Sequence, residues 1–172
     1  MTHAANHFLY FGFGKFLVMS DPVDIVALVR ALPSRPRGRG CIVLTHAYEG
    51  QREWAAELAR QTGSEHIDLM ALFVQDTDIS RQIGQFHVPR LFEFLTGRSS
   101  APVLIVSGVE FLKATWSGQP NAVSQFASLI NTWDKSPCLP FAVQHDKELE
   151  KYDFGRRFSY MFVIDQKETL AL

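Results

Sequence analysis

Short apolar runs alternate along this chain with stretches in which apolar residues recur every three or four positions. Short apolar runs bounded by turn residues are typical of buried strands, and the wider spacing is typical of helices with one buried face. The predicted strands are 41–44, 67–73, 102–106, 139–143 and 160–164. The predicted helices are 51–61, 78–95 with a break or kink at Val88-Pro89, 122–133, and a short turn or helix near 147–152.

This alternation predicts a single three-layer α/β/α domain over residues 1–172, built on a mainly parallel five-stranded sheet. Residues 41–172 would form the core. Residues 1–40 would add an apolar strand or hairpin, a helix and a basic loop. That helix is expected to start at Ser20-Asp21-Pro22, where a capping side chain precedes a proline, and to bury Ile25, Leu28, Val29 and Leu32.

The charge balance and the cysteines indicate which partners and which compartment to expect. The chain has 172 residues, 47% of them hydrophobic, and its 17 basic and 18 acidic residues give a net charge of −1. Such a balance gives no overall attraction to nucleic acid or to anionic membranes. Cys41 and Cys138 each begin an apolar segment, which indicates buried, reduced thiols, and we expect a cytoplasmic protein.

The N-terminal stretch 8–19 is apolar and aromatic, but Lys15 interrupts it and it is too short to span a bilayer. We therefore expect neither a signal peptide nor a membrane anchor. An added strand or hairpin is the simpler interpretation. The alternative is a partner-binding surface, because aromatic residues are enriched at interfaces. That surface would use Phe8, Tyr10, Phe11, Phe13 and Phe16.

The residues after the first predicted strand occupy the place of a phosphate-binding loop. They read Thr-His-Ala-Tyr-Glu-Gly-Gln-Arg over 45–52 and lead directly into the next helix. A working loop reads G-x-x-x-x-G-K-[ST], because its backbone N–H groups wrap the phosphates, the Lys neutralises them and the hydroxyl holds Mg²⁺. Against that spacing Thr45 replaces the first Gly, Gly50 is kept, and Gln51 and Arg52 take the Lys and Ser/Thr places.

From these residues and its order of strands and helices, the segment 41–172 resembles a degenerate P-loop NTPase of the RecA or AAA-like kind. The resemblance implies that Ser107 stands in the place of the metal-associated Asp and Gly108 in that of the catalytic Glu that often follows. Glu110 lies two residues further on and is expected to point in a different direction. Gln144, at the end of the strand 139–143, takes the place of the residue that senses the γ-phosphate.

These replacements predict the loss of phosphoryl transfer, which depends on positioning and on charge stabilisation. The Lys and both metal-holding side chains are missing, and Glu49 adds a negative charge to the cradle. Arg52 could supply a charge for phosphate but no metal ligand. We therefore expect an inactive domain with no catalytic residue, metal or required cofactor, and binding of ATP or ADP without turnover stays open.

The leading hypothesis is a regulatory or assembly subunit of an ATPase or nucleic-acid-processing system that acts by binding proteins. An active ATPase would be one such partner, and an oligomer of this chain is a further option. Small P-loop proteins with eroded motifs occur in bacterial cell-division, DNA-repair and phage-defence systems. Arg156 and Arg157 could present an arginine to a neighbour's nucleotide, or form a solvated turn.

Two other functions remain open. A nucleotide sensor would use the crevice at the carboxyl ends of the strands, with Arg52, Gln144 and the arginines of the loop 35–39 as anion contacts. A DNA-binding accessory protein would use Arg35, Arg37 and Arg39, although such a run is also typical of a solvated linker.

Other chemistry has weaker support. The pairs His66/Asp68 and His145/Asp146 could each contact a metal, but two ligands do not make a site. Ser107 lacks the preceding glycine of a G-x-S-x-G nucleophile elbow. The stretch 106–116 also resembles part of TIR domains, which sense or hydrolyse NAD, but those domains usually continue with Cys and an acidic residue, where this chain has Ser-Gly.

Overall fold

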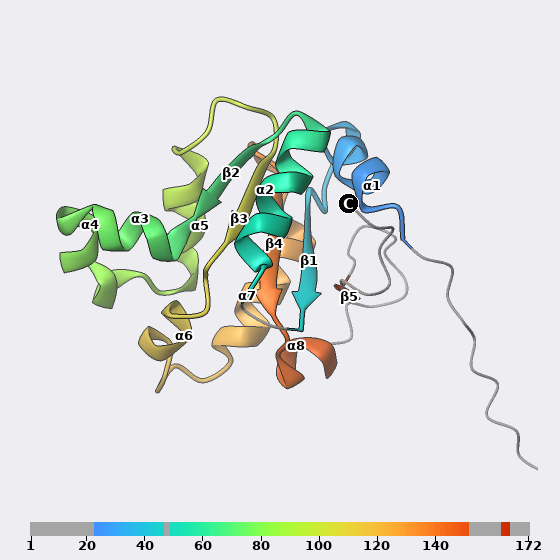
Figure 1. The fold of residues 1–172 in the computed structure, drawn as a ribbon. Coiled ribbons are helices and arrows are strands. Elements are labelled where there is room, and N and C mark those ends of the chain that lie inside the picture. Colours follow the sequence, from blue (N-terminus) through green and yellow to red (C-terminus); the bar gives the residue numbers. More distant parts are fainter. Residues whose placement is uncertain (1–22, 47–48, 152–162, 166–172) are drawn as a thin grey trace, which may run out of the picture.

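A parallel sheet with helices on both faces forms the body of the protein (Figure 1). The structure is a computed structural model that describes residues 23–46, 49–151 and 163–165. The strand order is β2-β3-β4-β1-β5, and all neighbouring strands are parallel. The strands are β1 (Gly40–Thr45), β2 (Glu65–Asp68), β3 (Leu104–Ser107), β4 (Leu139–Gln144) and the short β5 (Val163–Asp165). The predicted parallel α/β class is therefore confirmed.

The carboxyl ends of the strands meet at one edge of the sheet, which is the lower edge in Figure 1. There Thr45 at the end of β1 lies opposite Gln144 at the end of β4. Asp68 at the end of β2 likewise lies opposite Ser107 at the end of β3. We call this the carboxyl edge and the opposite one the amino edge.

Two groups of helices enclose the sheet. On one face α1 (Ile25–Ala31) and α2 (Gln51–Thr62) share a buried apolar cluster with β1, β3 and β4. On the other face α5 (Val88–Thr96) and α7 (Ala122–Thr132) belong to a second, larger cluster. The remaining helices are α3 (Leu69–Gln75), α4 (Thr77–Arg81), α6 (Leu112–Thr115), α8 (Lys147–Lys151) and the 3₁₀ turns Leu32–Ser34 and Ile83–Gln85.

Strand β1, which lies between β4 and β5, is buried on both faces. Ile42 and Leu44 pack into the α5 and α7 side, whereas Cys41 and Val43 pack into the α1 and α2 side. A strand covered on both faces needs apolar residues at every position, which explains its continuous run. Cys41 and Cys138 are both free, buried thiols, and burial raises the pKa of Cys41 to about 12.

The strand predicted over 67–73 is wrong in its second half. β2 ends at Asp68, and the apolar residues that follow form α3. The side chain of Asp68 accepts a hydrogen bond from the backbone N–H of Ala71, at 2.8 Å, and so caps this helix. A short apolar run does not distinguish a strand from a buried helical turn, whereas a capping aspartate does.

The break predicted at Val88-Pro89 within the helix 78–95 is confirmed, because this segment forms two helices. α4 ends at Arg81 and a 3₁₀ turn follows before α5 begins at Val88. Pro89 lies in the first turn of α5, where its missing N–H leaves no hydrogen bond unmade, so it starts a helix instead of kinking one.

The first helix also differs from its prediction. It begins at Ile25, and Asp24 caps it by accepting from the N–H of Ala27 at 2.9 Å. The proposed start at Ser20-Asp21-Pro22 lies outside the described residues, as do residues 160–162 of the last predicted strand. Within the described ranges, no helix is both long and apolar enough to cross a membrane.

Candidate functional site

The loop after β1 turns sharply at Gly50 to begin α2 at the carboxyl edge. Gly50 has φ +81°, a left-handed conformation that favours glycine. The next residue, Gln51, is only 2% exposed, although it stands at the start of a surface helix. The turn therefore sends the Gln51 side chain into the protein, and Arg52 lies exposed beside it.

The Gln51 side chain joins three segments of the carboxyl edge. Its Nε2 donates to Thr45 Oγ1 at 3.1 Å and to Glu110 Oε1 at 2.8 Å. Its Oε1 accepts from the backbone N–H of Gly108 at 3.1 Å. We call this set of contacts the Gln51 clasp. It satisfies both donor hydrogens of the amide and links β1 and α2 to the loop after β3.

Glu110 extends the clasp to β4. Its Oε1 also accepts from the backbone N–H of Gln144, at 2.6 Å. Its Oε2 is buried and makes no hydrogen bond to any of the described residues. The expectation that Glu110 points away is therefore wrong, because the turn after β3 returns its carboxylate toward α2. The side chain of Gln144 is exposed, so this residue joins the clasp through its backbone alone.

Ser107 is fully buried and lies in a second hydrogen-bonded group. Its Oγ lies 2.9 Å from His66 Nε2 and donates to Asp68 Oδ2 at 3.2 Å. Since its one proton goes to Asp68, the hydroxyl accepts from His66. Burial lowers the pKa of His66, with Arg52 lowering it further and Asp68 opposing the shift. Neutral His66 fits this arrangement.

This group is not a nucleophilic triad. In a triad the acid holds the histidine and the histidine takes the proton of the serine. Here Asp68 contacts the serine instead, and the Ser107 hydroxyl is closed off from solvent. The group therefore holds the ends of β2 and β3 together.

Gly108 allows these two strand ends to approach. Its φ is +68°, and a Cβ at this position would lie 2.8 Å from Asp68 Oδ1 and 3.0 Å from the Met70 backbone nitrogen. The glycine in the place of a catalytic Glu thus has a structural role of its own.

A cleft of about 440 Å³ lies between the start of α2 and α3, and we call it the α2–α3 cleft. Glu49, Arg52, Glu53 and Asp68 provide its charged groups. Its apolar wall includes Val74, whose exposed fraction of 77% is high for a large hydrophobic residue. A smaller hollow of about 230 Å³, lined in part by Arg52, His66 and Asp68, adjoins it.

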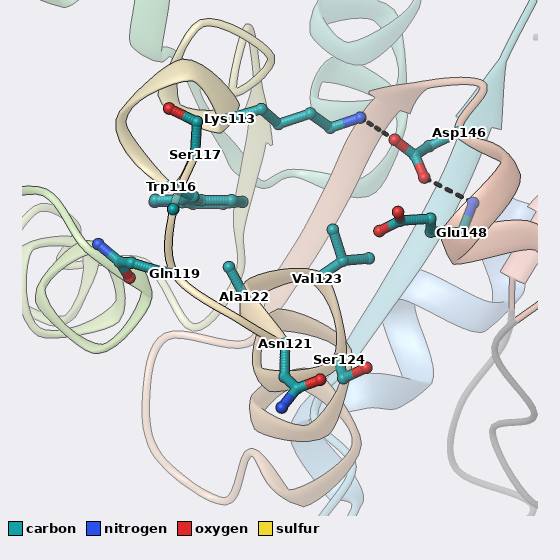
Figure 2. Close-up of a pocket in the computed structure, with 11 residues that line it drawn as sticks. Lys113, Trp116, Ser117, Gln119, Asn121, Ala122, Val123, Ser124, Asp146 and Glu148 are labelled. Carbon is teal, nitrogen blue, oxygen red and sulfur yellow. Dashed lines mark hydrogen bonds and ion pairs between the residues drawn. The ribbon is translucent and has the colours of Figure 1, made fainter.

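A larger pocket of about 530 Å³ opens between α6, the start of α7 and the start of α8 (Figure 2). Lys113 reaches across from α6 and forms an ion pair with Asp146 (Figure 2). Burial alone would raise the pKa of Asp146, but hydrogen bonds from Lys113 and from the backbone of Leu149 and Glu148 hold it below its usual range. The Lys113 charge is thus already neutralised within the protein.

The residues of the carboxyl edge do not fit a Mg²⁺–nucleotide complex. Gln51 is neutral and its polar atoms are all engaged, and the Ser107 hydroxyl is held by His66 and Asp68. In the ranges 23–46, 49–151 and 163–165, no three His, Cys, Asp or Glu side chains gather as a metal site. His145 instead pairs with Glu150 at 3.1 Å.

The basic loop, residues 35–39, lies at the amino edge because it leads directly into β1. The Arg39 guanidinium donates to the carbonyl oxygens of Arg35 and Asp134 and so holds the loop in place. Arg37 is exposed. These arginines cannot share a ligand with Arg52 and Gln144, since the two groups lie at opposite edges of the sheet. Phe11, Phe13, Arg156 and Arg157 lie outside the described residues.

Sequence reasoning placed Thr45, Ser107 and Gly108 at strand ends and Gln51 at the start of a helix, but it missed their contacts. It also missed the part played by His66 and Asp68. The available signal was a polar residue at the end of each of four parallel strands, since such ends converge at one edge.

No protein-family model matches this chain, and no curated protein matches it in sequence.

Proposed function

We propose that this chain is a catalytically inactive P-loop NTPase-like domain of RecA or AAA-like type. In this proposal it binds other proteins as a regulatory or assembly subunit of an ATPase or nucleic-acid-processing system. The Gln51 clasp is the observation that carries the proposal. The residue in the lysine place is withdrawn into the protein, where it ties strands together instead of facing a phosphate.

The topology supports the scaffold part of the proposal. In RecA and AAA-like domains, one strand separates the phosphate-loop strand from the strand that carries the metal-associated acid. Here β4 separates β1 from β3 in the same way. The loop after β1 leads into a helix N-terminus at Gly50, which is also the arrangement that a phosphate cradle uses.

The chemistry supports the inactive part. Glu49 and Glu53 flank the first turn of α2, where their carboxylates repel phosphate. The Ser107 hydroxyl replaces a carboxylate and is engaged by two side chains. Because the lysine charge and the metal ligands are both missing, the site can neither position the phosphoryl group nor stabilise the charge of its transition state.

The first experiment measures ATP hydrolysis and nucleotide binding by the purified full chain. We expect no Mg²⁺-dependent hydrolysis and no thermal shift with millimolar ATP, ADP, GTP or NAD, because a bound ligand would stabilise the fold by mass action. Hydrolysis that is lost on changing Gln51, Arg52 or Glu110 would overturn the proposal. Co-purification from the native source then identifies the partner.

A second candidate function, a nucleotide sensor without turnover, is favoured by the 530 Å³ pocket at the carboxyl edge. A volume of this order suits a small ligand. A thermal shift with one nucleotide and no hydrolysis would support the sensor. Loss of that shift in Lys113→Ala, with retention in the exposed control Lys135→Ala, would place the ligand in this pocket.

A further inference from the structure

The α2–α3 cleft combines an apolar wall with uncompensated negative charge. Glu49, Glu53 and Asp68 outnumber Arg52. Glu49, Arg52 and Glu53 are exposed, and their side chains make no hydrogen bond or ion pair with the part of the chain that the structure describes. Val74 leaves most of its side chain in water beside them. An occupant with an apolar stem and a cationic head would satisfy both features, and arginine has this form.

The same chain carries an exposed arginine of this kind on its basic loop. The Arg37 side chain is exposed and, within the described ranges, makes no hydrogen bond or ion pair. Arg39 fixes the loop through its bonds to two carbonyl oxygens, so Arg37 projects from a held segment. A pre-ordered loop loses little conformational freedom on binding.

Arg37 cannot enter the cleft of its own molecule. The basic loop precedes β1 at the amino edge, whereas Glu49 and Glu53 follow β1 at the carboxyl edge. The six residues of β1 separate the two edges by about 20 Å. Only a second molecule can bring these groups together. A net charge of −1 also leaves little overall repulsion between copies.

We propose that the α2–α3 cleft binds the basic loop of a second copy of this chain, with Arg37 between Glu49 and Glu53, so that copies associate head to tail. Such a contact joins two different surfaces, so in a pair one copy keeps its cleft free and the other keeps its basic loop free. Assembly therefore continues beyond a dimer. The inference goes beyond the proposed function, which concerns a different partner protein.

Sedimentation of the nucleotide-free full chain tests this proposal. At low salt the weight-average mass should rise with concentration past that of a dimer, and added salt should reverse the rise, because exposed charge pairs are screened. Arg37→Glu and Glu53→Arg should each weaken association at least about tenfold. The matched controls Arg90→Glu and Glu93→Arg reverse charges at exposed positions of α5 and should associate as the unaltered protein does.

A mixture of the two variants gives the sharpest result. Arg37→Glu keeps an intact cleft and Glu53→Arg keeps an intact loop, so one native contact forms between them. We expect the mixture to associate at least to a one-to-one heterodimer where each variant alone does not, which also shows that both variants are folded. A monomeric unaltered protein, single variants that associate normally, or a mixture that stays monomeric would each overturn the proposal. None of these results depends on nucleotide binding.

Discussion

The amide of Gln51 donates to the carboxylate of Glu110 across 2.8 Å, and this bond joins the first turn of α2 to the loop after β3. Gln51 is buried and Glu110 is half-buried, and a hydrogen bond to a charged acceptor is stronger in such surroundings than at the surface. The residues that take the catalytic places of a phosphate-binding site thus hold one another. Substitution of these residues should therefore lower the free energy of unfolding, whether or not it changes any activity.

Gln51→Ala is expected to lower the free energy of unfolding by about 2–4 kcal/mol, because it removes three hydrogen bonds and leaves the Gly108 N–H and Glu110 short of partners. Urea unfolding measures the change. Gln125→Ala is the matched control, since Gln125 is exposed on α7, and it should change stability by less than about 0.5 kcal/mol. Equal effects of the two variants would show that the clasp contributes nothing.

Gln51→Lys is expected not to restore nucleotide binding. The new ammonium group would enter the place where the amide meets Glu110, and the unsatisfied Oε2 of Glu110 offers it a carboxylate partner. Calorimetric titration with Mg²⁺–ATP checks this. The double variant Gln51→Lys with Glu110→Gln removes that partner and is the matched comparison. Tight ATP binding by Gln51→Lys alone would contradict the structural role assigned to Glu110.

Gly108→Ala should destabilise the protein more than Gly118→Ala. Both glycines have positive φ, so both alanines bear the backbone strain of that conformation, about 1 kcal/mol. Only at Gly108 does the added Cβ also meet Asp68 Oδ1 and the Met70 nitrogen, whereas nothing lies within 4 Å at Gly118. The difference between the free energies of unfolding of the two variants, measured with urea, isolates the contact of β2 with β3. We expect it to exceed about 1 kcal/mol.

Stability should fall as the pH drops below the ordinary pKa of histidine, in part because of His66. Its folded pKa is lowered, chiefly by burial, so between the two pKa values the unfolded chain binds a proton that the folded protein does not. The loss begins near pH 6.5 and levels off below the folded pKa. His66→Gln should flatten this part of the curve of unfolding free energy against pH.

The groups that face His66 are Ser107, Asp68 and Arg52, and only Asp68 favours its protonation. His145→Gln, at an exposed position, is the control and should retain the acid-dependent loss. An unchanged curve in His66→Gln would show that its protonation does not affect stability.

The general architecture was readable from the sequence because burial on both faces dictates continuous apolar strands such as β1 and β4. The helix α2 was also predicted nearly to its ends, since Gly50 and Gly63 flank it and both adopt left-handed conformations. An apolar run or a pair of flanking glycines is thus enough to locate a strand or a helix in the sequence.

Contacts between distant strands were not readable. Whether Glu110 turns outward or back toward Gln51 depends on the path of the loop after β3, which Gly108 sets through its positive φ and its contact with Asp68. Leu69 and Phe73 show the same limit, because burial rewards them equally in a strand or a helix, and the Asp68 cap decides between the two. Site chemistry is decided by such non-local geometry.

The two buried thiols are natural probes of how often the sheet opens. Cys41 and Cys138 lie in the sheet on the α1 and α2 side, and a thiol with a pKa near 12 is almost entirely protonated at neutral pH. Because the thiolate is the reactive form, a labelling reagent can modify Cys41 only in molecules whose central sheet has separated. The rate of labelling would therefore report how often the innermost part of the fold comes apart, with no probe added to the protein.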